Sequence, residues 1–172
     1  IAHMINESKR PVIYFGGGVT ASDACDEMAE LIEKADIPAT YTLMAAGVIG
    51  YDNPKNLGLI GMHGTISSNH AIDKADLIIA MGTRFSDRVA LNPKKFGKKA
   101  TIIQIDIDRS EIDKNVLVDK SCICDIKDFL IKLLPMIKRT EHKSWMHQIG
   151  EWKEREKVNE PNDGKLHPKM IM

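Results

Sequence analysis

Three short apolar runs, each followed at once by glycine or by a carboxylate, most constrain how this chain can fold. Residues 11–15 precede three glycines, residues 76–81 precede Gly82, and residues 101–105 precede Asp106. Apolar runs without alternation are typical of strands covered on both faces, and helical patterns separate the three runs. The sequence therefore predicts an α/β fold, with a doubly wound, mostly parallel, Rossmann-like sheet of about six strands and helices on both faces.

The remaining elements follow from apolar spacing and from turn residues. Apolar residues three and four apart predict a helix over 21–35, and Thr20 with Asp23 predicts a capping box at its start. Between a strand over 38–42 and a helix over 65–75 we expect a glycine-rich loop. Further elements expected are an N-terminal helix, a turn of helix over 110–113, a strand over 121–124, and a helix over 126–134 that Pro135 kinks or restarts.

Composition excludes some kinds of partner. The 172 residues carry 24 basic and 24 acidic side chains, so no net charge attracts nucleic acid or an anionic membrane. No stretch approaches the roughly 20 apolar residues of a membrane span, and the first residues lack the pattern of a signal peptide. Cys25, Cys122 and Cys124 show no paired metal spacing, and we interpret them as reduced and buried. We therefore expect a soluble, cytoplasmic protein with small-molecule or protein partners and no metal site in this chain.

Both ends of the sequence resemble positions within a longer protein. Ile1, Met4 and Ile5 have the spacing of a helix face that begins before residue 1, and an apolar pattern resumes at residues 170–172. The charge run at 154–157 is interpreted as a solvated face, and a turn-forming Pro-Asn-Asp-Gly segment follows at residues 161–164. We expect an excised domain over residues 1–156, followed by a linker over residues 157–172.

Polar residues and glycines gather after the predicted strands, where an open α/β sheet binds ligands. The three glycines let the backbone approach a phosphate at a helix N-terminus, although a tight turn without a ligand explains them equally well. Arg84 and Arg88 suit an anion such as a pyrophosphate, or else form a surface cluster with Asp87. Asp106 stands where doubly wound folds bind a ribose hydroxyl, whereas Asp108 is better explained as the cap of the following turn.

His63 lies between glycines, in a segment where the chain can lie flat against a ring system. The sequence offers it no serine or cysteine partner with the spacing of a nucleophile. We therefore interpret His63 as a contact residue and predict no catalytic residue in this chain.

Four segments taken together resemble one family. They are RPVIYFGGGV from residue 10, GMHGT from residue 61, GTRFSDRV from residue 82 and DIDRSEI from residue 106. In order and in spacing they resemble the central domain of the catalytic large subunit of acetolactate synthase, among the thiamine diphosphate enzymes, over residues 10 to 130. The resemblance implies that this domain holds FAD that takes no part in net redox chemistry. The FAD contacts it implies are Gly17, Gly18, Thr42, Leu43, Gly61, Met62, His63, Gly82, Thr83, Arg84, Asp87, Arg88, Asp106, Ile107, Glu111, Asp125 and Ile126.

The resemblance also implies an activity for the whole enzyme. That enzyme condenses two pyruvates, or pyruvate with 2-oxobutyrate, to acetohydroxy acids with loss of carbon dioxide in branched-chain amino acid biosynthesis. Thiamine diphosphate and Mg²⁺ would bind in flanking domains, because no Gly-Asp-Gly…Asn segment occurs here. The partners implied are 2-oxo acid substrates, those flanking domains, further copies in a homo-oligomer and a regulatory small subunit. Two alternatives stay open: a nucleotide-free scaffold domain of a related thiamine diphosphate-dependent 2-oxo acid decarboxylase, and a redox flavin or nicotinamide domain.

Overall fold

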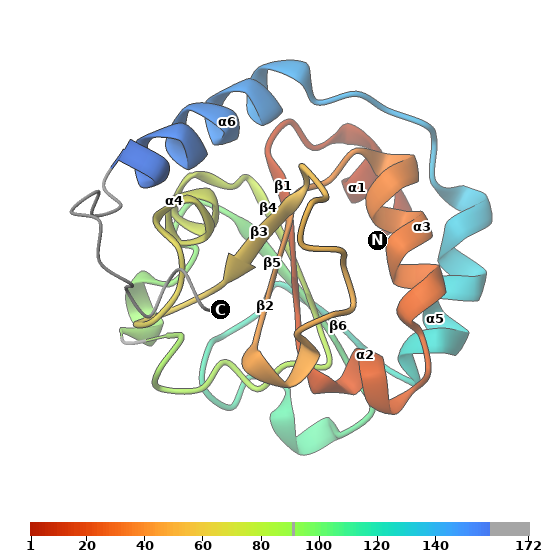
Figure 1. Ribbon diagram of the computed structural model, residues 1–172. Helices are drawn as coiled ribbons and strands as arrows, with labels where there is room; N and C mark the ends of the chain where they lie inside the picture. Colours follow the sequence, from red (N-terminus) through yellow and green to blue (C-terminus); the bar gives the residue numbers. More distant parts are fainter. Residues whose placement is uncertain (91, 159–172) are drawn as a thin grey trace.

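The computed structural model describes residues 1–90 and 92–158. They form a six-stranded sheet in which every neighbouring pair of strands is parallel, with the order β3-β2-β1-β4-β5-β6 (Figure 1). This is the strand order of the doubly wound dinucleotide-binding fold, so the predicted fold class is confirmed. The strands are β1 (Pro11–Phe15), β2 (Ala39–Tyr41), β3 (Asn56–Leu59), β4 (Leu77–Met81), β5 (Thr101–Asp106) and β6 (Lys120–Ile123).

Helices cover both faces of the sheet, as the sequence predicts (Figure 1). One face carries α1 (Ala2–Glu7), α2 (Gly17–Ala21), α3 (Cys25–Ala35) and α5 (Ile126–Leu133), and the other carries α4 (Ile66–Lys74) and α6 (Lys143–Val158). Four short 3₁₀ helices complete the described elements: η1 (Leu43–Ala45), η2 (Pro93–Lys95), η3 (Arg109–Glu111) and η4 (Leu134–Met136).

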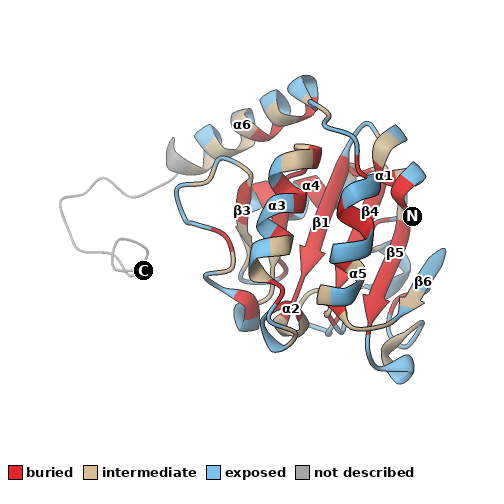
Figure 2. Cartoon of the chain, turned by 90° about the vertical axis from the view of Figure 1, so that its right-hand side faces the viewer, coloured by how far each residue is buried: buried red, intermediate tan, exposed pale blue. Residues whose placement is uncertain are grey.

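Alternate residues of the central strands point into two separate hydrophobic cores. In β1, Ile13 and Phe15 pack with α3 and α5, whereas Val12 and Tyr14 pack with α4 and α6. All residues of β1 and β4 are buried, as the red strands of Figure 2 show. Two covered faces explain why these strands are apolar without alternation, and each large buried side chain contributes roughly 1.5–3 kcal/mol.

Some local predictions are wrong. The helix expected over 21–35 is two helices, because the chain turns at Asp23, which has a left-handed φ of 53°. Thr20 lies inside α2, and α3 begins after Ala24 without a side-chain cap, so the capping box does not form. β3 occupies part of the expected glycine-rich loop. Its Asn56 and Gly58 disfavour strands, which hid this edge strand from pattern analysis.

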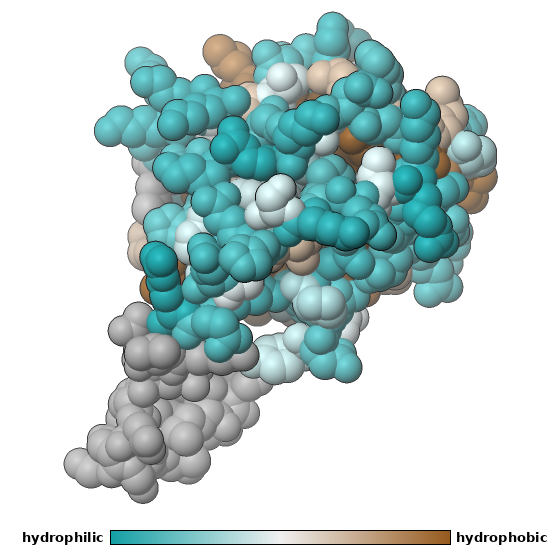
Figure 3. Space-filling model, turned by 90° about the horizontal axis from the view of Figure 1, so that it is seen from above, coloured by the Kyte–Doolittle hydropathy of each residue, from teal (hydrophilic) through white to brown (hydrophobic). Residues whose placement is uncertain are grey.

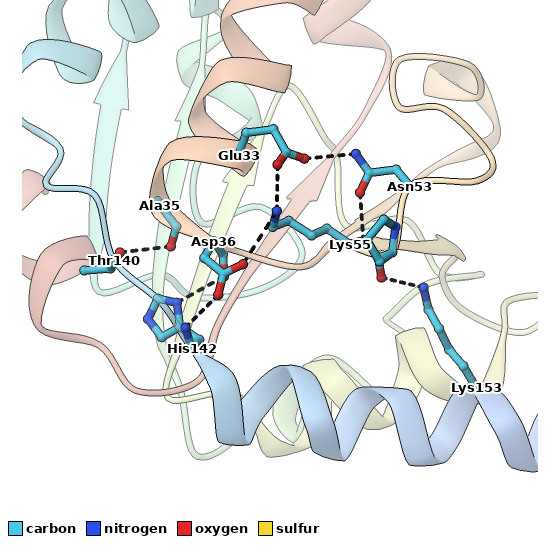
Figure 4. A network of polar contacts seen from close by, with 9 residues as sticks. Glu33, Ala35, Asp36, Asn53, Lys55, Thr140, His142 and Lys153 are labelled. Carbon is cyan, nitrogen blue, oxygen red and sulfur yellow. Dashed lines mark hydrogen bonds and ion pairs between the residues drawn. The ribbon is translucent and has the colours of Figure 1, made fainter.

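A polar network closes the amino edge of the sheet between the end of α3 and the segment that enters β3 (Figure 4). Lys55 Nζ lies 2.7 Å from Glu33 Oε2 and 3.6 Å from Asp36 Oδ1. Asn53 Nδ2 donates to the other oxygen of Glu33 at 3.0 Å. The Lys55 hydrogen bond is the main reason why the pKa of Glu33 is lowered.

α6 is anchored on the same edge. The His142 amide donates to Asp36 Oδ2 at 2.7 Å just before α6, and Trp145 Nε1 donates to the Pro11 carbonyl at 3.0 Å. Lys153 Nζ donates to two carbonyls of the segment that enters β3, at 2.7 and 2.6 Å. The helix includes Lys157 and Val158, and the rest of the predicted linker lies outside the described residues.

Figure 3 looks onto the molecule from above α6, and this face is mainly hydrophilic. Among the described residues, no helix combines the length and the apolar character needed to cross a bilayer. The cysteines are free thiols, as predicted, but all three are partly exposed, so their predicted burial is wrong.

Candidate functional site

A cleft of about 720 Å³ opens at the carboxyl edge of the sheet. It lies across the point where strand order reverses, because the chain leaves β1 toward β2 on one side and leaves β4 toward β5 on the other. Ligands of open α/β sheets bind in this crevice, and the volume lies within the roughly 300–1,000 Å³ usual for cofactor pockets. The predicted contact residues that line it are Gly17, Gly18, Thr42, Leu43, Met62, His63, Gly82, Thr83, Arg84, Arg88, Asp106 and Glu111.

The other predicted contact residues lie beside this lining and mostly serve the backbone. Asp87 Oδ1 accepts from the Arg88 amide at 3.0 Å, and the side chain of Asp125 caps the start of α5. Ile126 is buried below the turn after β1, and the Ile107 side chain is exposed. Gly61 supports the cleft from behind, as described below. Residues that sequence reasoning did not assign to the site are Tyr14, Met44, Leu59, Ile60, Ser86, Val89 and Asp108.

The turns after β1 and β4 touch through their backbones. The Gly18 amide donates to the Gly82 carbonyl at 3.1 Å, and a Cβ on Gly82 would lie 2.6 Å from Gly18 Cα. Gly82 also has a left-handed φ of 57°, which favours glycine. A Cβ on Gly17 would meet only the Met44 residue, at 3.0 Å or more. Gly18 and Gly82 are therefore needed for packing, and Gly17 is the glycine that leaves backbone open to the cleft.

The loop after β4 is anchored by one buried aromatic ring, and its charged side chains are exposed to solvent. Phe85 is buried in a left-handed conformation, with its ring centroid 5.5 Å from that of Tyr14 in an edge-to-face arrangement. On either side of it, Arg84, Ser86 and Arg88 are exposed and line the cleft. The buried ring thus fixes a loop that holds two guanidinium groups at the rim, where forked hydrogen bonds to an anion are geometrically accessible.

The loop that carries His63 is held in place from behind. Asn69 accepts from the Gly61 amide at 3.1 Å and donates to the Gly61 carbonyl at 3.0 Å, and the Arg88 carbonyl accepts from the Met62 amide at 2.9 Å. This arrangement joins the His63 loop to the arginine loop across the cleft.

Glu156 of α6 fixes the start of α4. Its carboxylate accepts hydrogen bonds from the amides of Ile66 and Ser67, and from the Ser67 hydroxyl at 2.8 Å. A carboxylate at the first turn of a helix pairs with amides that have no partner inside the helix. For Glu156, the prediction of a merely solvated face is therefore wrong.

Unpartnered polar atoms gather beneath the cleft. Among the described residues, Tyr14 Oη, Thr83 Oγ1, Gln104 Oε1 and Glu111 Oε2 are buried without a hydrogen-bond partner. Burial raises the pKa of Tyr14 to about 12, and the neighbouring Thr83 hydroxyl opposes this shift. Each unsatisfied group costs roughly 1–3 kcal/mol, so a cluster of them in a stable fold points to a functional reason.

The two sides of the cleft differ in polarity. On the side of β2 and β3, Leu43, Met44 and Met62 expose 74%, 75% and 57% of their surfaces. On the side of β4 and β5 the lining is charged, with Arg84, Asp106 and others. An elongated ligand with an apolar ring system at one end and hydroxyl or phosphate groups along its length matches this division. Within the described residues, no group of three or more His, Cys, Asp or Glu side chains is placed to hold a metal ion.

Two predictions about the segment after β5 have different outcomes. Asp108 Oδ1 accepts from the Ser110 amide at 2.8 Å, so its predicted capping role is confirmed, although it also lines the cleft. Asp106 is largely buried, and its Oδ1 accepts from the Asp108 amide at 3.0 Å. Its predicted contact with a ribose hydroxyl stays a prediction.

Comparison with known proteins identifies a family whose sequence pattern this chain matches. Residues 1–133 match the family described as thiamine pyrophosphate enzyme, central domain. The acetolactate synthase large subunit of Cyanidium caldarium is 41% identical over 170 residues, which cover 95% of this chain and 29% of that protein. The probable acetolactate synthase large subunit of Methanocaldococcus jannaschii is 44% identical over 155 residues, covering 88% and 26%. The acetolactate synthase isozyme 1 large subunit of Escherichia coli is 42% identical over 148 residues, covering 86% and 26%. The chain thus spans less than a third of the length of these relatives.

Proposed function

Since this chain belongs to the family of thiamine pyrophosphate enzyme central domains, we propose that it is the FAD-binding centre of an acetolactate synthase large subunit. The observation that carries the proposal is the cleft at the β1–β4 switch point, which combines an open glycine backbone, two exposed arginines and unpartnered polar atoms. In this role the domain binds FAD without net redox chemistry and links the two flanking catalytic domains.

The residues present fit an extended dinucleotide. Gly17 and the guanidinium groups of Arg84 and Arg88 would hold the pyrophosphate, because forked donors and open backbone suit phosphate oxygens. The carboxylates of Asp106 and Glu111 would accept hydrogen bonds from ribose hydroxyls on the polar side. On the apolar side, Leu43, Met62 and His63 would contact a ring system.

The whole protein would condense two pyruvates, or pyruvate and 2-oxobutyrate, to acetohydroxy acids with loss of carbon dioxide in branched-chain amino acid biosynthesis. Thiamine diphosphate supplies the carbanion chemistry when it is bound, and we place it and Mg²⁺ in flanking domains. This placement is supported by the relatives, which are more than three times as long as the matched segment. We also propose a homo-oligomer, a regulatory small subunit and a cytoplasmic location.

Cofactor analysis of the full-length protein tests this proposal. We expect FAD to copurify, and we expect acetolactate to form from pyruvate when thiamine diphosphate and Mg²⁺ are added. The 172-residue chain alone should form none, because it would lack the thiamine site. A protein without flavin that releases only a decarboxylated aldehyde would favour the scaffold alternative. A tightly bound nicotinamide, or a flavin that turns over with substrate, would favour a redox domain.

A further inference from the structure

Two cysteine side chains meet at the free edge of the sheet, away from the cleft lining. β6 is the last strand of the sheet, and Cys122 Sγ lies 3.2 Å from Cys124 Sγ. Residues two apart in a strand point to the same side, and the chain bends at Cys124 directly after β6 ends. The two thiols are therefore already in contact, and both are partly exposed.

The two thiols are not equivalent. Burial, followed by the contact with Cys122, raises the pKa of the Cys124 thiol to about 12, so this group stays protonated at neutral pH. Because the thiolate is the nucleophile, the raised pKa makes Cys124 a poor first site of attack. We assign that attack to Cys122, which lies in contact with it. Cys124 then acts as the resolving thiol, since a group held in contact reacts at a high effective concentration despite its high pKa.

We propose that Cys122 and Cys124 form a reversible redox modification site, which closes into a disulfide by exchange with a small disulfide such as oxidised glutathione. The Cys122 thiolate attacks one sulfur of the small disulfide, which breaks its S–S bond and releases one reduced thiol. Cys124 Sγ then attacks Cys122 Sγ, gives its proton to water and releases the second reduced thiol. In total, two protein thiols are oxidised to one disulfide, and one small disulfide is reduced to two thiols.

Closure of this pair acts on backbone next to the cleft. The Cys124 amide donates to the Asp106 carbonyl at 3.1 Å, and the following residue, Asp125, caps α5. Ile126, the first residue of α5, packs against the contact between Gly18 and Gly82. Drawing Cys124 toward Cys122 therefore displaces the start of α5, and the amides of residues 124–128 should exchange hydrogen faster in the disulfide form.

Peptide mapping of the full-length protein tests the proposal, because trypsin cleaves after Lys120 and Lys127 and releases both cysteines on one peptide. The reduced protein is treated with oxidised glutathione, quenched with acid, alkylated and digested. We expect this peptide to lose both alkyl labels and two hydrogen atoms, and to regain both labels after dithiothreitol. Cys25 lies on another peptide and should stay alkylated.

Single variants separate the two roles. Cys124→Ser should keep one glutathione on Cys122, Cys122→Ser should leave Cys124 largely unmodified, and Cys25→Ser should close as the wild type does. A peptide that stays doubly alkylated, carries two glutathiones or joins a second chain would overturn the proposal. Equal reactivity of Cys124 in the Cys122→Ser protein would overturn the assigned order of attack.

Discussion

At the amino edge of the sheet the Lys55 ammonium is held between Glu33 and Asp36, whereas at the carboxyl edge the hydroxyls of Tyr14 and Thr83 have no partner among the described residues. The same parallel strands begin at the amino edge and end at the carboxyl edge, and both edges carry polar groups close to the core. The first edge is completed by the chain itself, through α3, the segment before β3 and the approach to α6 (Figure 4).

The second edge is left incomplete. Its loops are fixed by backbone contacts and by the buried ring of Phe85, and they leave exposed arginine and methionine side chains lining the cleft. This difference supports our proposal that the carboxyl edge binds a ligand, whereas the contacts of the amino edge stabilise the fold. Substitutions in the polar network of the amino edge should therefore lower the free energy of unfolding, whereas substitutions of the cleft lining should lower the affinity for FAD.

The largest effect on the fold is expected at the carboxyl edge, where Gly18 and Gly82 bring the turns after β1 and β4 into contact. Gly82→Ala would place a Cβ 2.6 Å from Gly18 Cα and would force a left-handed alanine. We expect the free energy of unfolding to fall by roughly 2–5 kcal/mol, from strain and overpacking together. Urea denaturation monitored by circular dichroism measures it. A loss below about 1 kcal/mol would show that the contact relaxes easily.

The next effect is expected at the amino edge. Lys55→Met removes the ion pairs with Glu33 and Asp36 while keeping an apolar side chain of similar length. We expect the free energy of unfolding to fall by about 1 kcal/mol, because the Glu33 side chain is partly exposed and solvent screens the pair. Affinity for FAD should not change. A weaker affinity would mean that the amino edge also shapes the cleft.

A pair of hydroxyl deletions compares the two edges directly. Thr140→Val removes a hydroxyl that donates to the Ala35 carbonyl at 3.0 Å, and should lower the free energy of unfolding by about 1 kcal/mol. Tyr14→Phe removes a buried hydroxyl that lies near the Thr83 hydroxyl without a hydrogen bond of ordinary geometry, and should leave the ligand-free protein unchanged or stabilise it by up to about 1 kcal/mol. Denaturation of both flavin-free proteins measures the contrast. Equal losses would mean that the Tyr14 hydroxyl has a partner after all.

The smallest effect expected is a pH dependence at the amino edge. The Lys55 hydrogen bond lowers the pKa of Glu33 in the folded state below its ordinary value of 4.5. A lowered folded pKa means that the stabilisation is complete above the ordinary value and is lost as pH falls through the folded value. The stability difference between wild type and Lys55→Met should therefore shrink from about pH 7 to about pH 3. A difference that stays constant would mean that the stabilisation does not come from the Glu33 carboxylate.

Much of the fold can be predicted from the sequence, because buried parallel strands leave a direct pattern. β5 (Thr101–Asp106) covers the predicted apolar run over 101–105 and the carboxylate that follows it, and the 3₁₀ helix η4 follows α5 at Pro135, as predicted. β3 could not be predicted, since its pairing with β2 and not its own residues makes it a strand. The left-handed turn at Asp23 likewise leaves little trace in local composition.

The candidate site is predicted less completely than the fold. Glycines, arginines and carboxylates at strand ends indicate where the cleft is, because those positions follow from the fold class alone. Tyr14 lines the cleft because of its position in the sheet, and Ile60 lines it because of the path of the loop between β3 and α4. Both features are defined only in the folded chain. For Tyr14, the signal in the sequence is a hydroxyl within an otherwise apolar strand. The sequence also does not show that Gly18 packs against Gly82 while Gly17 does not, because this depends on where the turn after β4 lies.

The central claim is that the carboxyl edge binds FAD, and a flavin fluorescence titration of the full-length protein beside its Gly17→Val variant tests it most directly. A Cβ at Gly17 would lie within 4 Å of Met44 alone, so we expect the fold to lose less than about 1 kcal/mol, while the valine would hold a pyrophosphate away from the backbone. We predict tight, saturable binding to the wild type and a dissociation constant at least roughly tenfold higher for the variant, or about 1.4 kcal/mol. Equal affinities with an intact fold, or no flavin binding by the wild type, would contradict the account.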